Sequence, residues 1–234
     1  MVAHIKKGIP MSETSMLEKL NLVAKPIGIG GTKLELLSVE NIEPILAELE
    51  KKGPDGLKSF PYWIKIWEAS IVLAAHLSEQ DLDKNKTVLE LGAGMGVVGF
   101  FLAAFGFPVT LSDANNDALE LMEKNASRNH LDTVVIKKLD WNNFESREKY
   151  DIVCGAELVY KRTDIKSVLS AIETCVKPDG TVFLAHNIKQ ISMIDFLAEA
   201  GKYFDIEHAG KSMTISGEKK QFVLHTMTKK TYSG

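Results

Sequence analysis

The chain has 234 residues, of which 45% are hydrophobic, with a formal net charge of −3 and a pI of about 6.1. Because there is no overall basic charge, the composition does not favour tight binding to a nucleic-acid backbone. No apolar run of about 18 residues is present, so the sequence predicts no membrane span. The N-terminus has lysines but lacks the apolar stretch of a secretory signal.

The two cysteines, Cys154 and Cys175, both fall in apolar segments. This is typical of reduced, buried thiols in a cytoplasmic protein. The histidines, at positions 4, 76, 130, 186, 208 and 225, never pair at ligand spacing, so we expect no metal site. The lysines at 33, 51, 52, 58 and 65 are dispersed, and we expect them, Lys65 included, to lie on a solvated surface.

The first elements along the chain form an N-terminal extension. Two short strands joined by a glycine turn are predicted over residues 23–37. Asn41 is expected to cap a helix that runs to about Leu49 with one apolar stripe. A segment rich in aromatic residues at 60–67 follows, just ahead of an apolar helix. We expect residues 1–60 to form this extension and residues 61–234 to form the main domain.

Strands and helices alternate over the rest of the chain. The strands are predicted at 88–91, 108–113, 134–138, 150–156, 181–186, 204–208 and 221–227, and the main helices at 117–125, 165–176 and 190–201. A tight turn at 177–180 is expected to lead into the fifth strand. This alternation predicts an α/β fold, a Rossmann-like seven-stranded sheet with its last strand antiparallel and helices on both faces.

The most informative feature is the segment 88–96, where an apolar strand runs into Glu90 and then three alternating glycines. Such glycines let the backbone turn sharply and approach a nucleotide-like ligand. Residues 94–99 also match the dinucleotide pattern G-x-G-x-x-G, a weak signal by itself. An acid in the loop would repel a pyrophosphate, whereas it suits the ammonium and sulfonium of S-adenosylmethionine. Glu90 could instead only cap the loop by accepting backbone N–H bonds.

Residues 90–96 resemble motif I of the class I, seven-strand S-adenosylmethionine-dependent methyltransferases. The resemblance implies cofactor binding by residues of this motif, namely Glu90, Gly92, Ala93, Gly94 and Gly96. Asp113 ends the second strand, seventeen positions after Gly96, where a carboxylate can accept both ribose hydroxyls. Its neighbour Ala114 is expected beside the cofactor. Dehydrogenases use the same acid, so Asp113 does not separate the two classes.

Two further matches, one after the third strand and one after the fourth, favour the methyltransferase, because a dehydrogenase has no counterpart to them. Asp140 and Trp141 follow the third strand. In the resembling family an Asp in this loop takes the adenine amino group, and its neighbour lies against the ring. Trp141 offers a large apolar face for that contact, although it could equally be a core aromatic. Trp67, at the start of the helix before the sheet, is implied to lie over the donor site, with Tyr62 or Trp63 at the acceptor entrance.

Glu157 and Tyr160, three positions apart after the fourth strand, carry the subfamily signal. They resemble the D-x-x-Y signature of the methyltransferase-16 group, which includes protein-lysine methyltransferases. This chain has Glu where that signature has Asp. We expect Glu157 and Tyr160 to be catalytic, binding an acceptor amine and steering its proton away, with Glu157 also touching the cofactor. The alternative is that Glu157 caps the next helix and Tyr160 packs.

The sequence therefore predicts a cytoplasmic S-adenosylmethionine-dependent methyltransferase that N-methylates a protein lysine, as a monomer or weak dimer. The cofactor is S-adenosylmethionine, and S-adenosylhomocysteine is the product. One alternative is a small-molecule, nicotinamide-like N-methyltransferase, because the resembling group contains such members. Alternatives of another class are a catalytically silent adenosylmethionine-binding module and an NAD-binding oxidoreductase.

Overall fold

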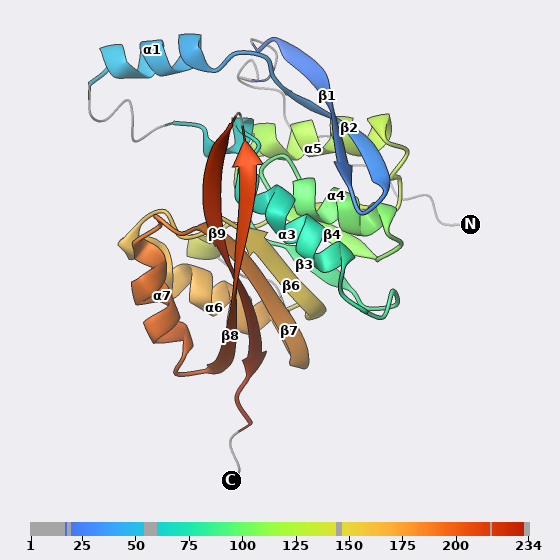
Figure 1. The fold of residues 1–234 in the computed structure, drawn as a ribbon, viewed down its shortest axis with the longest axis vertical. Helices are drawn as coiled ribbons and strands as arrows, with labels where there is room; N and C mark the ends of the chain where they lie inside the picture. The colour runs from blue at the N-terminus through green and yellow to red at the C-terminus, as the bar shows by residue number, and fades with distance from the viewer. Residues whose placement is uncertain (1–16, 18–19, 54–59, 144–146, 216, 232–234) are drawn as a thin grey trace.

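A seven-stranded sheet forms the centre of the molecule in the computed structural model, which describes residues 17, 20–53, 60–143, 147–215 and 217–231 (Figure 1). The strands are β3 (Val88–Glu90), β4 (Val109–Asp113), β5 (Val135–Lys138), β6 (Tyr150–Ala156), β7 (Val176–Asn187), β8 (Phe204–Ile215) and β9 (Glu218–Lys229). Their order is β5-β4-β3-β6-β7-β9-β8. The strands β3 to β7 are parallel, and β9 runs antiparallel to both its neighbours. The predicted sheet with an antiparallel last strand is confirmed.

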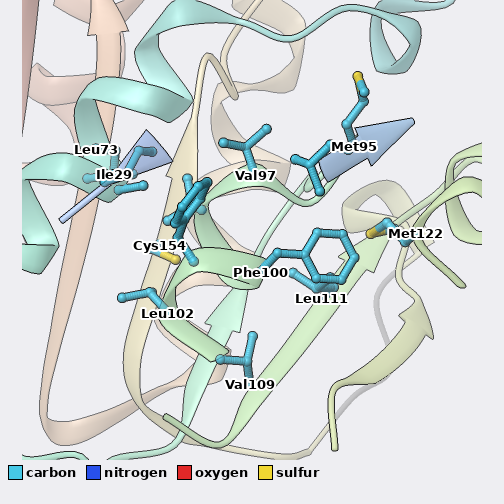
Figure 2. Packing of buried hydrophobic residues seen from close by; sticks show 14 of the residues in the cluster. Ile29, Leu73, Met95, Val97, Phe100, Leu102, Val109, Leu111, Met122 and Cys154 are labelled. Atoms are coloured by element: carbon cyan, nitrogen blue, oxygen red, sulfur yellow. The ribbon is translucent and has the colours of Figure 1, made fainter. Parts of the chain in front are cut away.

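Helices cover both faces of this sheet, as the sequence predicts. One face carries α3 (Glu68–Ser78), α4 (Val97–Ala104) and α5 (Asn116–Arg128), and the other carries α6 (Ile165–Cys175) and α7 (Ser192–Ala200). Side chains of a strand point alternately to the two faces. In β6, Cys154 accordingly packs in the first core, shown in Figure 2, and Val153 packs in the second.

An antiparallel hairpin of β1 (Leu22–Ile29) and β2 (Thr32–Val39) confirms the two predicted N-terminal strands. Asparagine side chains of α5 and of its C-cap bind β2: Asn125 Oδ1 accepts the backbone N–H of Leu37 at 2.7 Å, and Asn129 Oδ1 accepts that of Glu35 at 2.8 Å. The helix α1 (Glu43–Lys51) follows the hairpin. Within the expected extension 1–60, residues 1–16, 18, 19 and 54–59 lie outside the described residues.

The turn expected at residues 177–180 is wrong, because β7 already begins at Val176. Val176 pairs with Tyr150, and Thr181 pairs with Ile152, so the intervening residues form an irregularity within the strand pairing. The ion pair between Lys177 Nζ and a carboxylate oxygen of Asp151, 2.8 Å long, lies at this irregularity. The proline and glycine there interrupt the register without ending the strand.

Three histidines that lie far apart in the sequence come together on neighbouring strands. His225 Nε2 lies 2.9 Å from His186 Nε2, and His225 Nδ1 lies 2.7 Å from His208 Nδ1. The spacing of the histidines in the sequence does not reveal these contacts, because it is strand register that brings His208 opposite His225. In the part of the chain that the structure describes, no group of three or more His, Cys, Asp or Glu side chains is arranged to hold a metal ion. None of the described helices is long and apolar enough to cross a membrane.

Candidate active site

The strand order reverses between β3 and β6, since the chain runs outward from β3 to β5 on one side and from β6 to β7 on the other. The crevice outside the carboxyl ends of such strands is where open α/β sheets bind their ligands. A cavity of about 470 Å³ opens at this point, a volume typical of small-molecule sites. It is lined by the loops after β3, β4 and β6 and by the 3-10 turns η2 (Tyr62–Ile64) and η3 (Trp141–Asn143).

The glycine loop forms one wall of this cavity, to which Gly92, Ala93 and Gly94 contribute. Gly92 has a φ of +55°, and a Cβ there would lie 3.1 Å from Cζ3 of Trp141. Only glycine lets the backbone lie this close to the indole in that conformation. Gly96 is the N-cap residue just before α4, and it does not line the cavity.

Glu90 lies at the base of the loop and is 2% exposed. Its Oε2 accepts the backbone N–H of Gly99 at 2.7 Å, so this amide in the first turn of α4 is already hydrogen-bonded to the carboxyl group. A phosphate would need the free amides of that helix end. The predicted capping bond is thus present, and it stands against a dinucleotide at this helix. Burial raises the pKa of Glu90 to about 8.

Asp113 ends β4 and lines the same cavity. Its Oδ2 accepts the N–H of Gly94 at 2.9 Å, and its Oδ1 accepts the N–H of Asn115 at 2.9 Å. Burial raises the pKa of Asp113 above its usual range. Both oxygens are fixed in direction by backbone amides while each keeps a lone pair, which suits a ligand with two neighbouring hydroxyls. Ala114 is not among the residues that line the cavity.

Trp141 lines the cavity, but its predicted companion Asp140 does not. Asp140 Oδ1 accepts the N–H of Asn142 at 2.9 Å, which caps the turn η3. Asp140 lines a separate cavity of about 260 Å³ together with Lys138. The half-buried Trp141 also packs against the core on the α6 face. The structure therefore brings the indole, and not the acid, to the main cavity.

Glu157 follows β6 and is held in a strained backbone conformation, with a φ of +54°. Such a conformation in a residue other than glycine costs of order 1–3 kcal/mol and is often found at functional sites. Its side chain is 6% exposed, and Oε1 accepts the backbone N–H of Asn187 at 2.7 Å. The carboxyl group thus binds the end of β7 rather than the following helix. Burial raises the pKa of Glu157, and the ammonium of Lys65 lowers it.

Three aromatic rings gather at the mouth of the cavity beside Glu157. The ring of Tyr160 stacks on that of Tyr62 with centroids 4.6 Å apart, and it lies 5.9 Å from that of Trp67. Trp67 Nε1 donates a 2.9 Å hydrogen bond to the carbonyl of Tyr62, which fixes the indole. Burial raises the pKa of Tyr160, so its phenol stays protonated at neutral pH. We call Tyr62, Trp67 and Tyr160 the aromatic cluster.

Several lining residues were not predicted for the site, and Lys65 is the charged one among them that lies against the aromatic cluster. Lys65 is half-buried in the cavity wall, with its Nζ 4.6 Å from the centroid of the Trp67 ring. The expectation that Lys65 lies on a solvated surface is therefore wrong. A signal was present in the sequence, because Lys65 stands between Trp63 and Trp67 in an aromatic segment. The aromatic neighbours of Lys65, rather than the other lysines, indicate its position.

The residues of this cavity fit S-adenosylmethionine. An oriented carboxylate at Asp113 suits a ribose, the indole of Trp141 suits an adenine, and the acid Glu90 suits a cation. The fold is similar to that of the glycopeptide N-methyltransferase MtfA complexed with S-adenosylmethionine, with a TM-score of 0.57, 13% identity, and coverage of 69% of this chain and 94% of that chain. Fold and site together define a class I S-adenosylmethionine-dependent methyltransferase.

Comparison with known families gives the group within this class. A family model described as "Lysine methyltransferase" matches residues 62–202, more than half of the chain. The chain therefore belongs to this lysine methyltransferase family. It is 32% identical to "EEF1A lysine methyltransferase 3" of Xenopus tropicalis over 53% of this chain and 58% of that protein. It is 31% identical to "Protein N-lysine methyltransferase METTL21A" of Danio rerio over 61% of this chain and 68% of that protein. The first alignment spans less than two thirds of that relative's length.

Proposed function

We propose that this protein transfers a methyl group from S-adenosylmethionine to the side-chain amine of a lysine in another protein. The observation that carries the proposal is the position of Glu157 and Tyr160, which line the same cavity as Glu90 and Asp113. A donor end and an amine-binding end thus share one space. The family description and the lysine-methylating relatives support the choice of acceptor.

At the donor end, the chain binds and orients. When S-adenosylmethionine is bound, Asp113 would accept the ribose hydroxyls, Trp141 would lie against the adenine, and Glu90 would face the ammonium of the methionine moiety. S-Adenosylmethionine supplies a methyl group that is already activated by its sulfonium. The enzyme therefore needs little acid or base strength, and its main contribution is to hold the acceptor nitrogen in line with the methyl carbon.

At the acceptor end, the lysine ammonium must lose a proton before its nitrogen can act as a nucleophile. Glu157 accepts this proton or passes it to water, and the burial that raises the pKa of Glu157 makes it a better base than an exposed carboxylate. The protonated phenol of Tyr160 orients the amine. The aromatic cluster binds the cationic form of the side chain before the proton is lost.

We also propose that the protein works in the cytoplasm. Both cysteines, Cys154 and Cys175, are free and buried. Buried thiols that form no disulfide suit a reducing compartment.

Label transfer tests the proposed acceptor. The protein is incubated with methyl-tritiated S-adenosylmethionine and a cell extract, and the extract is then separated into macromolecules and small molecules. We expect label in protein, recovered after acid hydrolysis as methylated lysine, with Glu157→Gln as the inactive control. Label only in small molecules would replace the protein acceptor with a small-molecule one. Binding of S-adenosylhomocysteine without label in any fraction would indicate a silent binding module.

A further inference from the structure

The side chain of Lys65 is a cation inside the proposed active site. Its Nζ lies over the ring of Trp67, 4.6 Å from the centroid, and the residue lines the cavity together with Glu157 and Tyr160. An ammonium within about 6 Å of an indole face is attracted by the ring. Lys65 therefore places its amine against the ring of Trp67, one of the three rings that we propose for the acceptor.

The ammonium of Lys65 affects the pKa values of two nearby acids, Glu157 and Glu68. The pKa of Glu157 is raised above its usual range, chiefly by burial and also by the charge of Glu68, while the hydrogen bond from Asn187 and, less strongly, the ammonium of Lys65 lower it. The pKa of Glu68 lies below its usual range although burial raises it, because the hydrogen bond from Lys220 and the charge of Lys65 both lower it. Glu68 is held by Lys220 at 2.7 Å, whereas Glu157 accepts a hydrogen bond from the backbone amide of Asn187. Of these two acids, Glu157 is the one that lines the cavity together with Lys65.

A lysine from another protein would need the same environment, with aromatic faces for its stem and ammonium and a buried carboxylate nearby. Lys65 has the same ammonium on the same four-carbon stem, and it is covalently fixed next to that environment. We propose that Lys65 occupies the acceptor-amine subsite in the acceptor-free enzyme and has to leave before a substrate lysine enters. This inference rests on the proposed function, since it names the subsite of that same reaction.

Displacement of Lys65 has a defined kinetic consequence. The contact between Lys65 and Trp67 is lost when the acceptor binds, so it weakens acceptor binding and leaves the later methyl transfer unaffected. An exposed cation–π contact corresponds to about a twofold to fivefold change in an equilibrium constant. Lys65 is then a specificity-determining residue, because only an acceptor that binds the aromatic cluster better than Lys65 does can enter.

Lys65→Met tests this, because methionine keeps an unbranched apolar stem and removes the ammonium. We expect KM for the acceptor protein to fall about twofold to fivefold with kcat unchanged. Lys65→Arg keeps a cation and should retain the wild-type KM. Lys84→Met is the matched control, since Lys84 Nζ lies 4.1 Å from the Phe107 ring centroid and does not line the cavity. An unchanged or higher KM in Lys65→Met would overturn the proposal.

A binding measurement separates this inference from the proposed function. With S-adenosylhomocysteine present, n-butylammonium chloride is titrated as a mimic of the lysine side chain. We expect it to bind Lys65→Met about twofold to fivefold more tightly than wild type and Lys65→Arg no more tightly, whether or not wild type methylates any protein. Equal binding to wild type and Lys65→Met would overturn the inference while leaving the label-transfer result unaffected. A gain in affinity for S-adenosylhomocysteine instead would place Lys65 at the donor end and also overturn it.

Discussion

The carboxyl group of Glu90 accepts a 2.7 Å hydrogen bond from the backbone amide of Gly99, across the packing of β3 on α4. A Cβ at Gly99 would lie 2.9 Å from Glu90 Oε2 and 2.1 Å from Cδ2 of Leu111. The third glycine of the G-x-G-x-x-G pattern therefore allows close helix–strand packing and gives room to an acid. The same bond leaves Glu90 buried at the base of the cavity, where its protonation can respond to a ligand.

Glu90 should make cofactor binding depend on pH. Burial raises its pKa to about 8, so the acid is mostly protonated at pH 6.5 in the free protein. A ligand ammonium favours the ionised form, so binding releases a proton below pH 8 and affinity rises with pH. We expect S-adenosylhomocysteine to bind about tenfold more tightly at pH 8 than at pH 6.5 by calorimetry. Glu90→Gln should remove this dependence, and equal pH profiles for the two proteins would refute the role.

The packing at Gly99 should make it intolerant of any side chain. Gly99→Ala inserts a methyl group into contact with Leu111 and Glu90, and overpacking of this kind costs about 1–3 kcal/mol. Gly210→Ala is the control, because a Cβ at Gly210 meets nothing within 4 Å. Urea unfolding should show the loss of free energy for Gly99→Ala alone. Equal effects of the two substitutions would show that the helix and strand are not tightly packed there.

The histidines on β7, β8 and β9 should make the fold sensitive to acid. Burial, together with the charges of His186 and His208, lowers the pKa of His225 to about 3. Below pH 6.5 the unfolded chain takes up a proton that the folded His225 does not, so stability falls as the pH drops from about 6.5 towards 3. Urea unfolding measured from pH 4.5 to 7.5 gives the free energy of unfolding at each pH. This free energy should change less steeply with pH in His225→Gln than in wild type. Parallel curves would mean that His225 does not stay neutral in the folded protein.

Substitution of Glu157 should affect turnover more than cofactor affinity. Glu157→Gln keeps an amide oxygen for the N–H of Asn187 and removes the charge. We expect kcat to fall about 100-fold or more while the affinity for S-adenosylhomocysteine changes less than twofold. Tyr160→Phe, which keeps the ring stacked on Tyr62, should lower kcat by about tenfold. If kcat/KM is unchanged in both variants, the assignment of these two residues is wrong.

Local patterns in the sequence predicted the sheet and the glycine loop. The apolar strand before Glu90 and the strand ending at Asp113 carry their own signals, because strand periodicity and turn glycines act over a few residues. Contacts between distant segments could not be predicted in this way. His208 meets His225 because of the register of two strands. Lys65 is half-buried because it lies in the wall of a cavity that Trp67 and Tyr160 also line.

In the proposed active site, too, contacts between distant segments could not be predicted from local patterns. Glu157 and Tyr160 were predicted from their spacing. The hydrogen bond that Glu157 accepts from Asn187, by contrast, joins the ends of two strands and links residues 30 positions apart in the sequence. Asp140 shows the converse, because its side chain caps a local turn and lines a different cavity from Trp141. Neighbours in sequence can point in different directions, so a motif alone does not determine which of two adjacent side chains reaches a ligand.

Thermal denaturation with S-adenosylhomocysteine, and separately with NAD, tests most directly the central claim that the cavity between β3 and β6 binds S-adenosylmethionine. A ligand that binds only the folded protein adds about 2.7 kcal/mol at 100 times its Kd, which raises Tm by about 5–10 °C for a chain of this size. We predict this shift with S-adenosylhomocysteine and its loss in Asp113→Ala, with no shift from NAD. A shift from NAD alone would contradict the account of Glu90, Asp113 and Trp141.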